Sequence, residues 1–316
     1  MSLDSLSVRV SAIEEVAPLI REFTLEPVAG SLPPFSPGSH VQVIMPDDDR
    51  EIRNAYSLCS DPRDTSRYRI AVRLQENSRG GSRFMHTRVR PGDKLKITPP
   101  ANFFAPAGQG KRHLLIAGGV GITPFISYIP ELERQGAPFE LHYLYRGSQT
   151  GAYRDELSNR LGARFVSYDS EQGERCDLSA LLLGREPGTH VYICGPESLI
   201  EGVCSTARAL GWPESLIHFE AFAAPEPGEP FRVTLARSGK AVEVGSDESL
   251  LEALERAGVA VPNLCRGGVC GQCVTPVVEG EVDHRDHFLS AEERRCSRSI
   301  MPCVSRAIGK HLTLDL

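Results

Sequence analysis

Residues 264–273 read LCRGGVCGQC and place three cysteines and three glycines within ten positions. Cys265, Cys270 and Cys273 follow the spacing C-x4-C-x2-C, which is the spacing of plant-type 2Fe–2S sites whose fourth cysteine lies further along the chain. Bridging sulfides carry negative charge and attract backbone N–H donors, and glycine lets the backbone come close because it has no Cβ atom. The stretch therefore predicts an iron–sulfur domain.

A structural zinc site is the competing interpretation of the same cysteines. Zinc usually takes two separated C-x2-C pairs, and this stretch contains only one. Two later cysteines compete for the fourth ligand position of a cluster. Cys296 lies in the charged stretch EERRCSRS, whereas Cys303 lies in IMPCVSRA, beside apolar side chains that can shield a cluster from water. We therefore expect Cys303 to be the fourth ligand.

The composition of the chain limits the classes of function that are open. Its 316 residues exceed what one hydrophobic core usually serves, so more than one domain is expected. A formal net charge of −6 argues against nucleic acid or an anionic membrane as the main partner. The N-terminus lacks the pattern of a secretion signal, and the most apolar run is broken by glycine and proline. We expect a cytoplasmic protein without a membrane anchor, whose nine cysteines stay reduced.

A change of composition marks the last domain boundary. The stretch AAPEPGEP, residues 223–230, interrupts every periodic pattern, and we predict a linker over residues 225–231. In the iron–sulfur domain, residues 232–316, the alternation around Ser238-Gly239 indicates a hairpin. The stretch SDESLLEALERAGV then indicates a helix capped by Ser246 or Asp247, and HLTLDL indicates a closing strand.

Two further segments precede the linker and differ in their patterns. Residues 1–104 contain short β patterns, such as HVQVIMP and YRIAVRL, between Pro/Gly turns, which indicates an all-β barrel or sandwich. In residues 105–224 strands such as HLLIAGG and HVYICGP alternate with helical patterns such as PFISYIPELERQG. This alternation is typical of a parallel, doubly wound α/β sheet that binds nucleotides.

The stretch LLIAGGVGITPF indicates a strand, a glycine-rich turn and a helix start, with Thr123 as the cap and Pro124 in the first helical position. Such a turn offers unpaired N–H groups and the positive end of a helix dipole to a pyrophosphate. The spacing of Gly118, Gly119 and Gly121 does not match G-x-G-x-x-G. A tight turn without a ligand therefore stays an alternative.

A second stretch of the same kind, YICGPESLI, follows later in the α/β segment. It places Cys194 at the carboxyl end of a buried strand, with Gly195 and Pro196 leading into a helix. Doubly wound sheets bind their ligands at such strand ends. Two turns of this kind in one domain together favour a nucleotide site.

The β segment contains a polar strand, RNAYSLCS, with Arg53, Tyr56 and Ser57. A guanidinium can pair with a phosphate, and a phenol ring can cover a planar heterocycle. The stretch SRGGSRFMH adds a Gly-Gly-Ser turn that enters a helix and is a second candidate for anion binding. An ordinary amphipathic strand is the alternative interpretation of RNAYSLCS.

Taken together and in this order, the three segments resemble the phthalate dioxygenase reductase family, which includes reductases of vanillate demethylase and carnitine monooxygenase type. The resemblance covers essentially the whole chain. The motifs that carry it are RNAYSLC, RGGSRFMH, GGVGITP, ICGP, HFEAF, CRGGVCGQC and PCVSRA. Each motif is modest, but their joint order is specific.

This resemblance implies a multidomain protein with a flavin-binding barrel, a nicotinamide domain and a C-terminal, β-grasp-like ferredoxin domain. It implies that the polar strand binds flavin and that the Gly-Gly-Ser turn holds the flavin phosphate. The flavin positions so implied are Arg53, Tyr56, Ser57, Ala71, Val72, Gly80, Gly81, Ser82, Thr123 and Phe222. Members with this layout use FMN, and we find no adenine contacts that would indicate FAD.

The resemblance also implies the nicotinamide site and its catalytic residues, Thr123, Cys194 and Glu220. The nucleotide positions are Gly118, Gly119, Gly121, Pro124, Arg146, Cys194, Gly195 and Pro196. One feature departs from NADH-dependent enzymes, which often carry an acidic residue after the second strand. Here that strand is followed by Arg146 and Ser148, a pair that suits a 2′-phosphate. The family prefers NADH, so we expect NADH and keep NADPH as the alternative.

The mechanism implied is a conversion from two-electron to one-electron transfer. NADH delivers hydride to the flavin, and single electrons then pass through the cluster to a terminal oxygenase of Rieske type. Two other functions stay open from the sequence. In the first, the electron acceptor is a haem protein or a ferredoxin and not a Rieske-type oxygenase. In the second, the chain is a non-redox binding protein with a structural zinc module.

Overall fold

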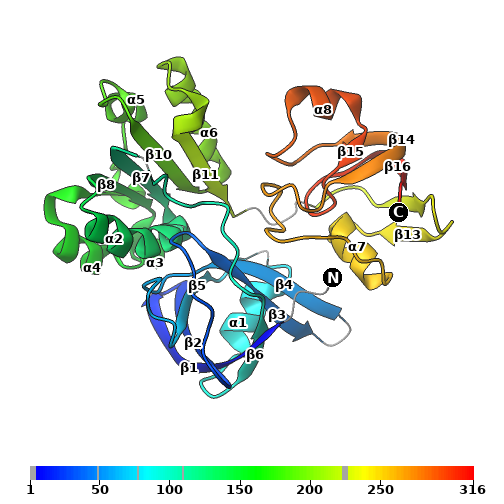
Figure 1. The fold of residues 1–316 in the computed structure, drawn as a ribbon, viewed down its shortest axis with the longest axis horizontal. Coiled ribbons are helices and arrows are strands. Elements are labelled where there is room, and N and C mark those ends of the chain that lie inside the picture. Colours follow the sequence, from blue (N-terminus) through cyan, green and yellow to red (C-terminus); the bar gives the residue numbers. More distant parts are fainter. Residues whose placement is uncertain (1–4, 48–49, 77, 109, 223–226) are drawn as a thin grey trace. The chain divides into compact units, whose positions relative to one another are not determined.

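A computed structural model describes residues 5–47, 50–76, 78–108, 110–222 and 227–316 of the chain (Figure 1). These residues form two compact units, which we call the first unit (residues 5–222) and the second unit (residues 227–316). Residues 225 and 226 of the predicted linker lie outside the described residues. The exact domain boundaries predicted from the sequence stay predictions.

The amino-terminal half of the first unit is a β-barrel. Its strands are β1 (Leu6–Ala17), β2 (Ile20–Pro27), β3 (His40–Asp47), β4 (Arg50–Ser57), β5 (Tyr68–Arg73) and β6 (Lys94–Ile97). They form one sheet in the order β4-β3-β6-β1-β2-β5, with every pairing antiparallel. An antiparallel bridge between Leu58 and Ile70 joins the two ends of this order, so the sheet closes.

The interior of the barrel is filled by residues that alternate along the strands. Val8 and Val10 of β1 and Phe23 and Leu25 of β2 are all fully buried in this core, and Val10 lies directly opposite Leu25. Helix α1 (Gly81–Thr87) packs against β5 and β4. Its Met85 is fully buried in the same core.

The second half of the first unit is a doubly wound α/β domain. Its strands are β7 (Arg112–Gly118), β8 (Phe139–Tyr145), β9 (Phe165–Asp169), β10 (Thr189–Gly195) and β11 (Ile217–Ala221). All pair in parallel, in the order β11-β10-β7-β8-β9. The chain order reverses between β7 and β10, so their carboxyl ends form the switch point where such sheets bind ligands.

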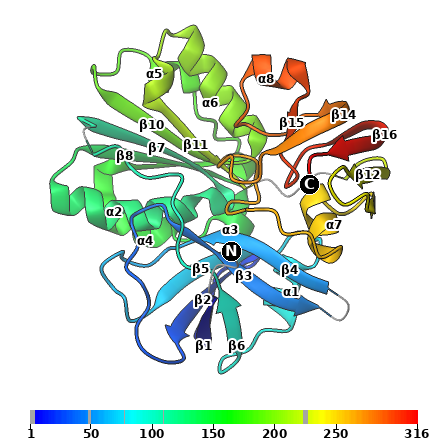
Figure 2. The same cartoon turned by 45° about the vertical axis from the view of Figure 1, so that its right-hand side comes forward.

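Helices cover both faces of this sheet (Figure 2). The helices are α2 (Thr123–Gln135), α3 (Gly147–Thr150), α4 (Arg154–Leu161), α5 (Leu178–Leu182) and α6 (Glu197–Ala209), with short 3₁₀ turns η1 (Gly119–Ile122), η2 (Gly162–Arg164), η3 (Ser170–Gln172) and η4 (Glu214–Leu216). The α5–α6 face has its own apolar core. The core on the α2–α4 face also includes Ile20, Cys59 and Ala71 of the barrel. This shared core explains why the two halves form one compact unit.

The switch point is tightly packed because its turns are built from glycine. A Cβ atom at Gly121 would lie 2.2 Å from the carbonyl oxygen of Cys194. A Cβ atom at Gly118 would lie 2.7 Å from Pro196, and one at Gly195 would lie 2.9 Å from the Cα of Gly118. The two strand-to-helix turns therefore touch backbone to backbone, which no residue with a side chain permits.

The second unit has a mixed five-stranded sheet. Its strands are β12 (Phe231–Leu235), β13 (Ala241–Val244), β14 (Thr275–Asp283), β15 (Ser299–Ile300) and β16 (Arg306–Leu314), and its helices are α7 (Leu250–Arg256) and α8 (Ala291–Cys296). The order is β13-β12-β16-β14-β15, and only β12 and β16 pair in parallel among these strands. Leu250 and Leu254 of α7 pack into the core under this sheet, which also contains Cys273 and Cys303.

The structure confirms the predicted fold class and corrects two predicted caps. Helix α7 is capped by Ser249 in a capping box with Glu252, not by Ser246 or Asp247. Helix α2 has Ile122 as its N-cap, so Thr123 is already helical and is not the cap. Five strands were not predicted individually: β1, β2, β11 and β14, whose polar residues blur the alternation, and β15, which has only two residues.

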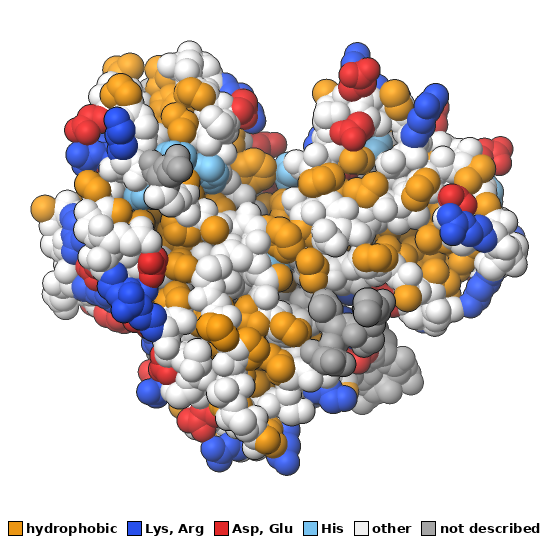
Figure 3. All heavy atoms as spheres, in the orientation of Figure 1, with side chains coloured by type: hydrophobic (Ala, Val, Ile, Leu, Met, Phe, Trp, Pro, Cys, Tyr) orange, Lys and Arg blue, Asp and Glu red, His pale blue; other side chains and the backbone are white. Residues whose placement is uncertain are grey.

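Two surface properties bear on the expected partners. None of the described helices combines the length and apolar character needed to cross a bilayer. On the face drawn in Figure 3, the basic and acidic side chains of the described residues are interspersed and do not gather into a patch of one sign. Nucleic-acid binding usually needs a concentrated basic surface, and this face does not provide one.

The close approach at the switch point predicts the effect of one methyl group. Gly121→Ala should destabilise the first unit by about 3 kcal/mol, because its Cβ atom would overlap the Cys194 carbonyl. Gly202→Ala in α6 is the matched control, because its Cβ atom would meet Leu178 at an ordinary 3.4 Å and alanine favours a helix. Thermal unfolding by circular dichroism measures both, and equal midpoints would contradict the packing described here.

Candidate functional site

The four cysteines predicted as cluster ligands come together in the second unit as two pairs. Cys265 and Cys270 share a hydrogen bond, and the sulfur atoms of Cys273 and Cys303 lie 3.3 Å apart. Three of the four lie in the loop between α7 and β14, and Cys303 lies between β15 and β16. Cys296 is the last residue of α8, and its side chain is exposed.

Backbone N–H groups surround the sulfur of Cys265. The hydrogen bond from Cys270, together with the N–H groups of Gly267, Val269 and Cys270 itself, lowers the pKa of Cys265 to about 5. The nitrogen of Gly267 lies 3.4 Å from the Cys265 sulfur. These donors stabilise negative charge on the sulfur, as a thiolate ligand requires.

The second cysteine pair is more deeply buried than the first. Cys273 and Cys303 are each only 1% exposed. The hydrogen bond between them lowers the pKa of Cys273 and raises the pKa of Cys303. An N–H group of Gly268 also points to Cys303. Apolar surroundings and inward N–H donors are the environment of a buried thiolate-bound centre.

The arrangement of the pairs fits a binuclear cluster. In a 2Fe–2S cluster with four cysteines, each iron takes two thiolates. No three His, Cys, Asp or Glu side chains of the described residues converge as they would around a single metal ion. The loop packs closely on its neighbours, because Cβ atoms at Gly268 and Gly271 would lie only 2.8 Å from Val304 and 2.3 Å from Phe288. Both glycines have positive φ, at 74° and 71°.

Arg266 fixes the loop from the side of α7 and was not singled out from the sequence. It adopts φ 53°, an uncommon conformation for a residue with a side chain. Its guanidinium makes two bonds to the Glu255 carboxylate, of 2.8 and 2.9 Å, and only 10% of its side chain is exposed. A two-pronged pair of this kind fixes orientation as well as distance.

The candidate nicotinamide site lies at the switch point of the first unit. Cys194 is completely buried and sits opposite Glu220 in the pairing of β10 with β11. Burial and the neighbouring Glu220 raise the pKa of Cys194 well above its ordinary value, so its thiol stays protonated. The hydroxyl of Ser57 lies 3.4 Å from a carboxylate oxygen of Glu220 and donates to it. The predicted flavin strand and the predicted nicotinamide residues therefore meet directly.

The neighbouring predicted residues differ in their exposure. Thr123 is buried, and its hydroxyl donates to the Val120 carbonyl at 3.0 Å. Pro124 follows it in the first turn of α2. Phe222, the last described residue of the first unit, is 42% exposed and so has an aromatic face open to a ligand.

Arg53, Tyr56 and Ser57 lie on β4, which pairs with β3 in an unbroken register and has no bulge. Arg53 forms a 2.6 Å ion pair with Glu51, so its guanidinium already has a carboxylate partner. Burial raises the pKa of Tyr56, whose hydroxyl accepts a 3.4 Å hydrogen bond from Asn54.

The predicted phosphate turn packs directly on the same strand. A Cβ atom at Gly81 would lie 2.3 Å from the Asn54 amide, and Gly80 has φ 114°. Ser82 is buried and donates to the hydroxyl of Ser78, which also accepts the N–H group of Gly80. Ser78 therefore competes for the N–H donors of the predicted phosphate site, a feature missed from the sequence.

Two other predicted flavin residues, Ala71 and Val72, lie on β5 and are buried. The carbonyl of Val72 bonds to the His86 ring of α1 at 2.8 Å, and Ala71 belongs to the core shared with the α/β domain. They lie on the strand that links the barrel to the switch point, with their side chains occupied in packing.

Arg146 follows β8 and has an acidic neighbour that the sequence reasoning missed. Its side chain is 81% exposed, and its Nε atom lies 3.8 Å from a carboxylate oxygen of Glu171. The turn brings Glu171 there because the buried Asp169 accepts the N–H groups of both Gly147 and Glu171. An acidic group thus lies beside Arg146, but it comes from the turn after β9 and not from the end of β8.

Comparison with known proteins gives two domain matches and a set of full-length relatives. Residues 233–307 match the family described as 2Fe-2S iron-sulfur cluster binding domain. Residues 94–217 match the family described as dimethylamine monooxygenase subunit DmmA-like, N-terminal domain.

Among the relatives, the heme-dependent oxidative N-demethylase beta subunit of Ectopseudomonas mendocina (strain ymp) is 58% identical, over 98% of this chain and 99% of that protein. The carnitine monooxygenase reductase subunit of Escherichia coli (strain K12) is 49% identical, over 98% of each chain. The solved structure of phthalate dioxygenase reductase, described as modular for electron transfer from pyridine nucleotides to [2Fe-2S], superposes with a TM-score of 0.86 at 35% identity. That match covers 99% of this chain and 98% of the other.

The chain belongs to the phthalate dioxygenase reductase family. Membership confirms the family expected from the motifs, the order of barrel, α/β domain and ferredoxin domain, and the assignment as an oxidoreductase of oxygenase systems. It also confirms the 2Fe–2S, flavin and NADH cofactors and argues against the zinc-binding alternative.

The sequence therefore led to the right family through short motifs. The residues that it missed make contacts whose sequence separations follow no known motif. Glu255 precedes Arg266 by eleven residues, a separation with no standard pattern. Asp286 lies in the stretch VDHRDHF, which was not singled out from the sequence. The one signal that could have identified Arg266 is that it is the single charged residue in the glycine-rich stretch 264–273.

Proposed function

We propose that this protein is the reductase subunit of a multicomponent oxygenase system, and that it passes electrons from NADH through FMN and a 2Fe–2S cluster to a terminal oxygenase. The observation that carries the proposal is the pairing of four cysteines in one unit of a chain whose other unit joins a flavin-type barrel to a nucleotide switch point. FMN, when bound, would supply the conversion of a two-electron hydride donated by NADH into single electrons, and the cluster would carry these one at a time.

The residues of the first unit support this function by positioning and by excluding water. We assign FMN to the strand with Arg53, Tyr56 and Ser57 and to the turn of Gly80, Gly81 and Ser82. Buried groups on the nicotinamide side limit access of water to the reacting atoms.

Cys194 and Thr123 have specific tasks in this proposal. Cys194 stays a neutral thiol because burial raises its pKa, so it offers a compact apolar surface to the nicotinamide. Thr123 directs its hydroxyl back to Val120 and leaves its methyl group for packing. Glu220 accepts the Ser57 hydrogen bond and holds the two halves of the site in register.

We assign the cluster to Cys265, Cys270, Cys273 and Cys303. The first pair is tied to α7 through Arg266, and the second pair lies in the apolar core of the second unit. N–H donors directed at the sulfur atoms raise the reduction potential from the value of an unsupported thiolate cluster, because they stabilise added negative charge.

The position of Glu171 beside Arg146 supports NADH as the electron donor in preference to NADPH. The carboxylate offsets the positive charge that would attract a 2′-phosphate, and it suits hydrogen bonding to a ribose hydroxyl.

Glu171→Gln should raise kcat/KM for NADPH about five-fold, which corresponds to about 1 kcal/mol for an exposed charge. The value for NADH should change little. Glu201→Gln, an exposed carboxylate on α6, is the control and should change neither value. Cytochrome c reduction with each nucleotide gives both constants, and a wild-type preference for NADPH would contradict the assignment.

A terminal oxygenase of Rieske type is the acceptor that the family resemblance favours. A haem-dependent N-demethylase is the second candidate, supported by the 58% identity to a beta subunit of that name and by the DmmA-like match. The two differ in what becomes reduced. Mixing the NADH-reduced protein with a purified Rieske oxygenase or with a haem-dependent N-demethylase alpha subunit, and following the absorbance of each centre by stopped flow, decides between them.

The role of the cysteines predicts a separation of two activities. Cys270→Ser should remove the visible absorption of the cluster and the reduction of cytochrome c, while NADH still reduces the flavin, which depends on the other unit. Cys296→Ser is the matched control and should keep the cluster, because Cys296 is exposed at the end of α8. Absence of iron and acid-labile sulfide from the wild-type protein, or loss of the cluster in the control, would contradict the assignment.

A further inference from the structure

A buried carboxylate lies beside the cluster loop in the second unit. The segment 284–290 follows β14 and runs along the loop, where the N–H group of His287 donates to the Gly268 carbonyl at 2.9 Å. The contact is close, because a Cβ atom at Gly268 would lie 3.2 Å from the Cα of Asp286. Gly268 is the middle of the stretch between Cys265 and Cys270, so Asp286 touches the centre of the loop that carries the first cysteine pair.

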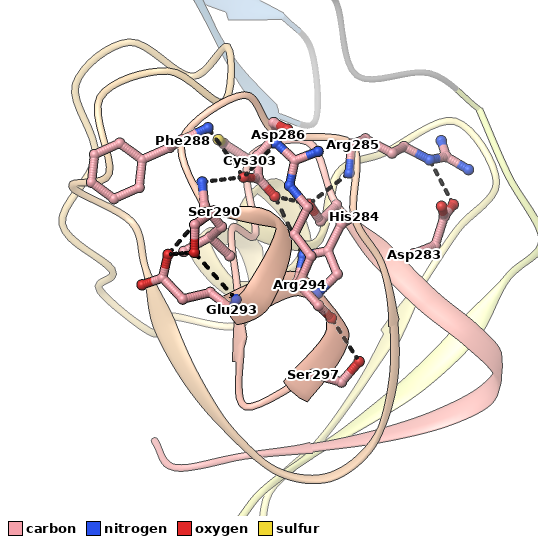
Figure 4. Close-up of polar contacts among 12 residues, drawn as sticks. Asp283, His284, Arg285, Asp286, Phe288, Ser290, Glu293, Arg294, Ser297 and Cys303 are labelled. Carbon is pink, nitrogen blue, oxygen red and sulfur yellow. Dashed lines mark hydrogen bonds and ion pairs between the residues drawn. The ribbon is translucent and has the colours of Figure 1, made fainter.

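The side chain of Asp286 is completely buried and satisfied from several sides (Figure 4). One carboxylate oxygen accepts the N–H groups of Phe288 and Leu289, at 3.2 and 2.8 Å. The other accepts the hydroxyl of Ser305 at 3.3 Å and lies 3.4 Å from the Nδ1 atom of His284. A buried carboxylate with this many donors has one fixed orientation.

Ser305 links this carboxylate to the second cysteine pair. It follows Cys303 by two residues and accepts the N–H group of Arg285 at 3.1 Å while donating to Asp286. Val304, between Cys303 and Ser305, would lie 2.8 Å from a Cβ atom at Gly268. Asp286 thus joins the segment that carries three cysteines to the segment that carries the fourth.

The arginine that forms an ion pair with Asp286 is only partly buried. The Nη2 atom of Arg294, on α8, lies 3.9 Å from the carboxylate and donates to the Asp286 backbone carbonyl at 2.5 Å. The Arg294 side chain is 37% exposed, so water screens it more than it screens the carboxylate. The electrostatic potential that Asp286 and Arg294 together produce at the cluster site is therefore net negative.

We propose that Asp286 is a positioning residue that holds the two ligand-bearing segments together, and that its buried charge lowers the reduction potential of the cluster. The inference rests on the proposed function only in taking these cysteines as the ligands of a 2Fe–2S centre. Reduction adds an electron next to a fixed negative charge, which disfavours the reduced form. A low potential suits a subunit that donates electrons to an acceptor.

Asp286→Asn tests the charge, because asparagine keeps the shape and one acceptor oxygen for the N–H groups of Phe288 and Leu289. The midpoint potential of the cluster, measured on the full-length protein by a redox titration followed by EPR, should become more positive. Arg294→Gln removes the opposing charge and should make the potential more negative. Glu292→Gln, an exposed carboxylate on the same helix, is the control and should leave the potential unchanged.

Asp286→Ala tests the positioning role, because it removes every acceptor. Its cluster absorption should decay several-fold faster than that of the wild type at the same temperature, and Ser305→Ala should show a smaller acceleration. If Asp286→Asn folds but fails to hold a cluster, the positioning role is supported and the sign of the Arg294→Gln shift decides the charge.

Two results overturn parts of the inference and are separable from failure of the proposed function. Unchanged potentials in both Asp286→Asn and Arg294→Gln, with iron and sulfide intact, remove the electrostatic role. Wild-type cluster lifetimes in Asp286→Ala remove the positioning role. Absence of iron and sulfide from the wild-type protein, by contrast, overturns the proposed function itself.

Discussion

Both candidate sites depend on one constraint: at several positions the backbone approaches its neighbours so closely that only glycine, which has no Cβ atom, fits. At the switch point, Gly121 brings one strand-to-helix turn against the carbonyl of Cys194, and Gly118 and Gly195 meet on the other side. In the second unit, Gly268 and Gly271 let the cysteine loop lie against Val304 and Phe288. Each place needs N–H groups presented to a ligand without intervening side chains, and glycine supplies this in both, although the folds are unrelated.

Glycine alone would leave these loops mobile, because it loses more conformational freedom on folding than other residues. The cluster loop is therefore held by two charged anchors. Arg266 ties it to Glu255 on α7, and Asp286 contacts it at Gly268. Both anchors are buried ion pairs or polar networks, which are costly to break because one partner would be left uncompensated. Their value to the protein lies in fixing one loop conformation.

The motifs were predictable because their chemistry is local in the chain. Cys265, Cys270 and Cys273 reveal a cluster through their spacing alone, and the GGVGITP and ICGP turns reveal a doubly wound sheet. Cys303 followed from its apolar neighbours, which the structure places in the core of the second unit.

The contacts between distant residues were not predictable, because their chemistry is not local in the chain. Ser57 meets Glu220 across 163 residues, and Asp286 meets Ser305 across 19, with no periodic pattern to connect either pair. The predicted cap of α7 was wrong although the competing residues are close in sequence. Ser246, Asp247 and Ser249 all suit an N-cap, and only Ser249 has Glu252 at the capping-box position. Arg146 suggested a phosphate site until the fold placed Glu171 beside it.

The distribution of cores explains how the two units differ in their dependence on cofactors. The barrel and the α/β domain share one core, and Glu22 of β2 accepts a 2.7 Å hydrogen bond from Tyr153 while also pairing with Arg69. Folding of one half therefore supports the other without any ligand. In the second unit, Cys273 and Cys303 are themselves core residues. Metal binding and folding are coupled when the ligands form part of the core. The second unit should accordingly be the part of the chain whose stability depends on its iron.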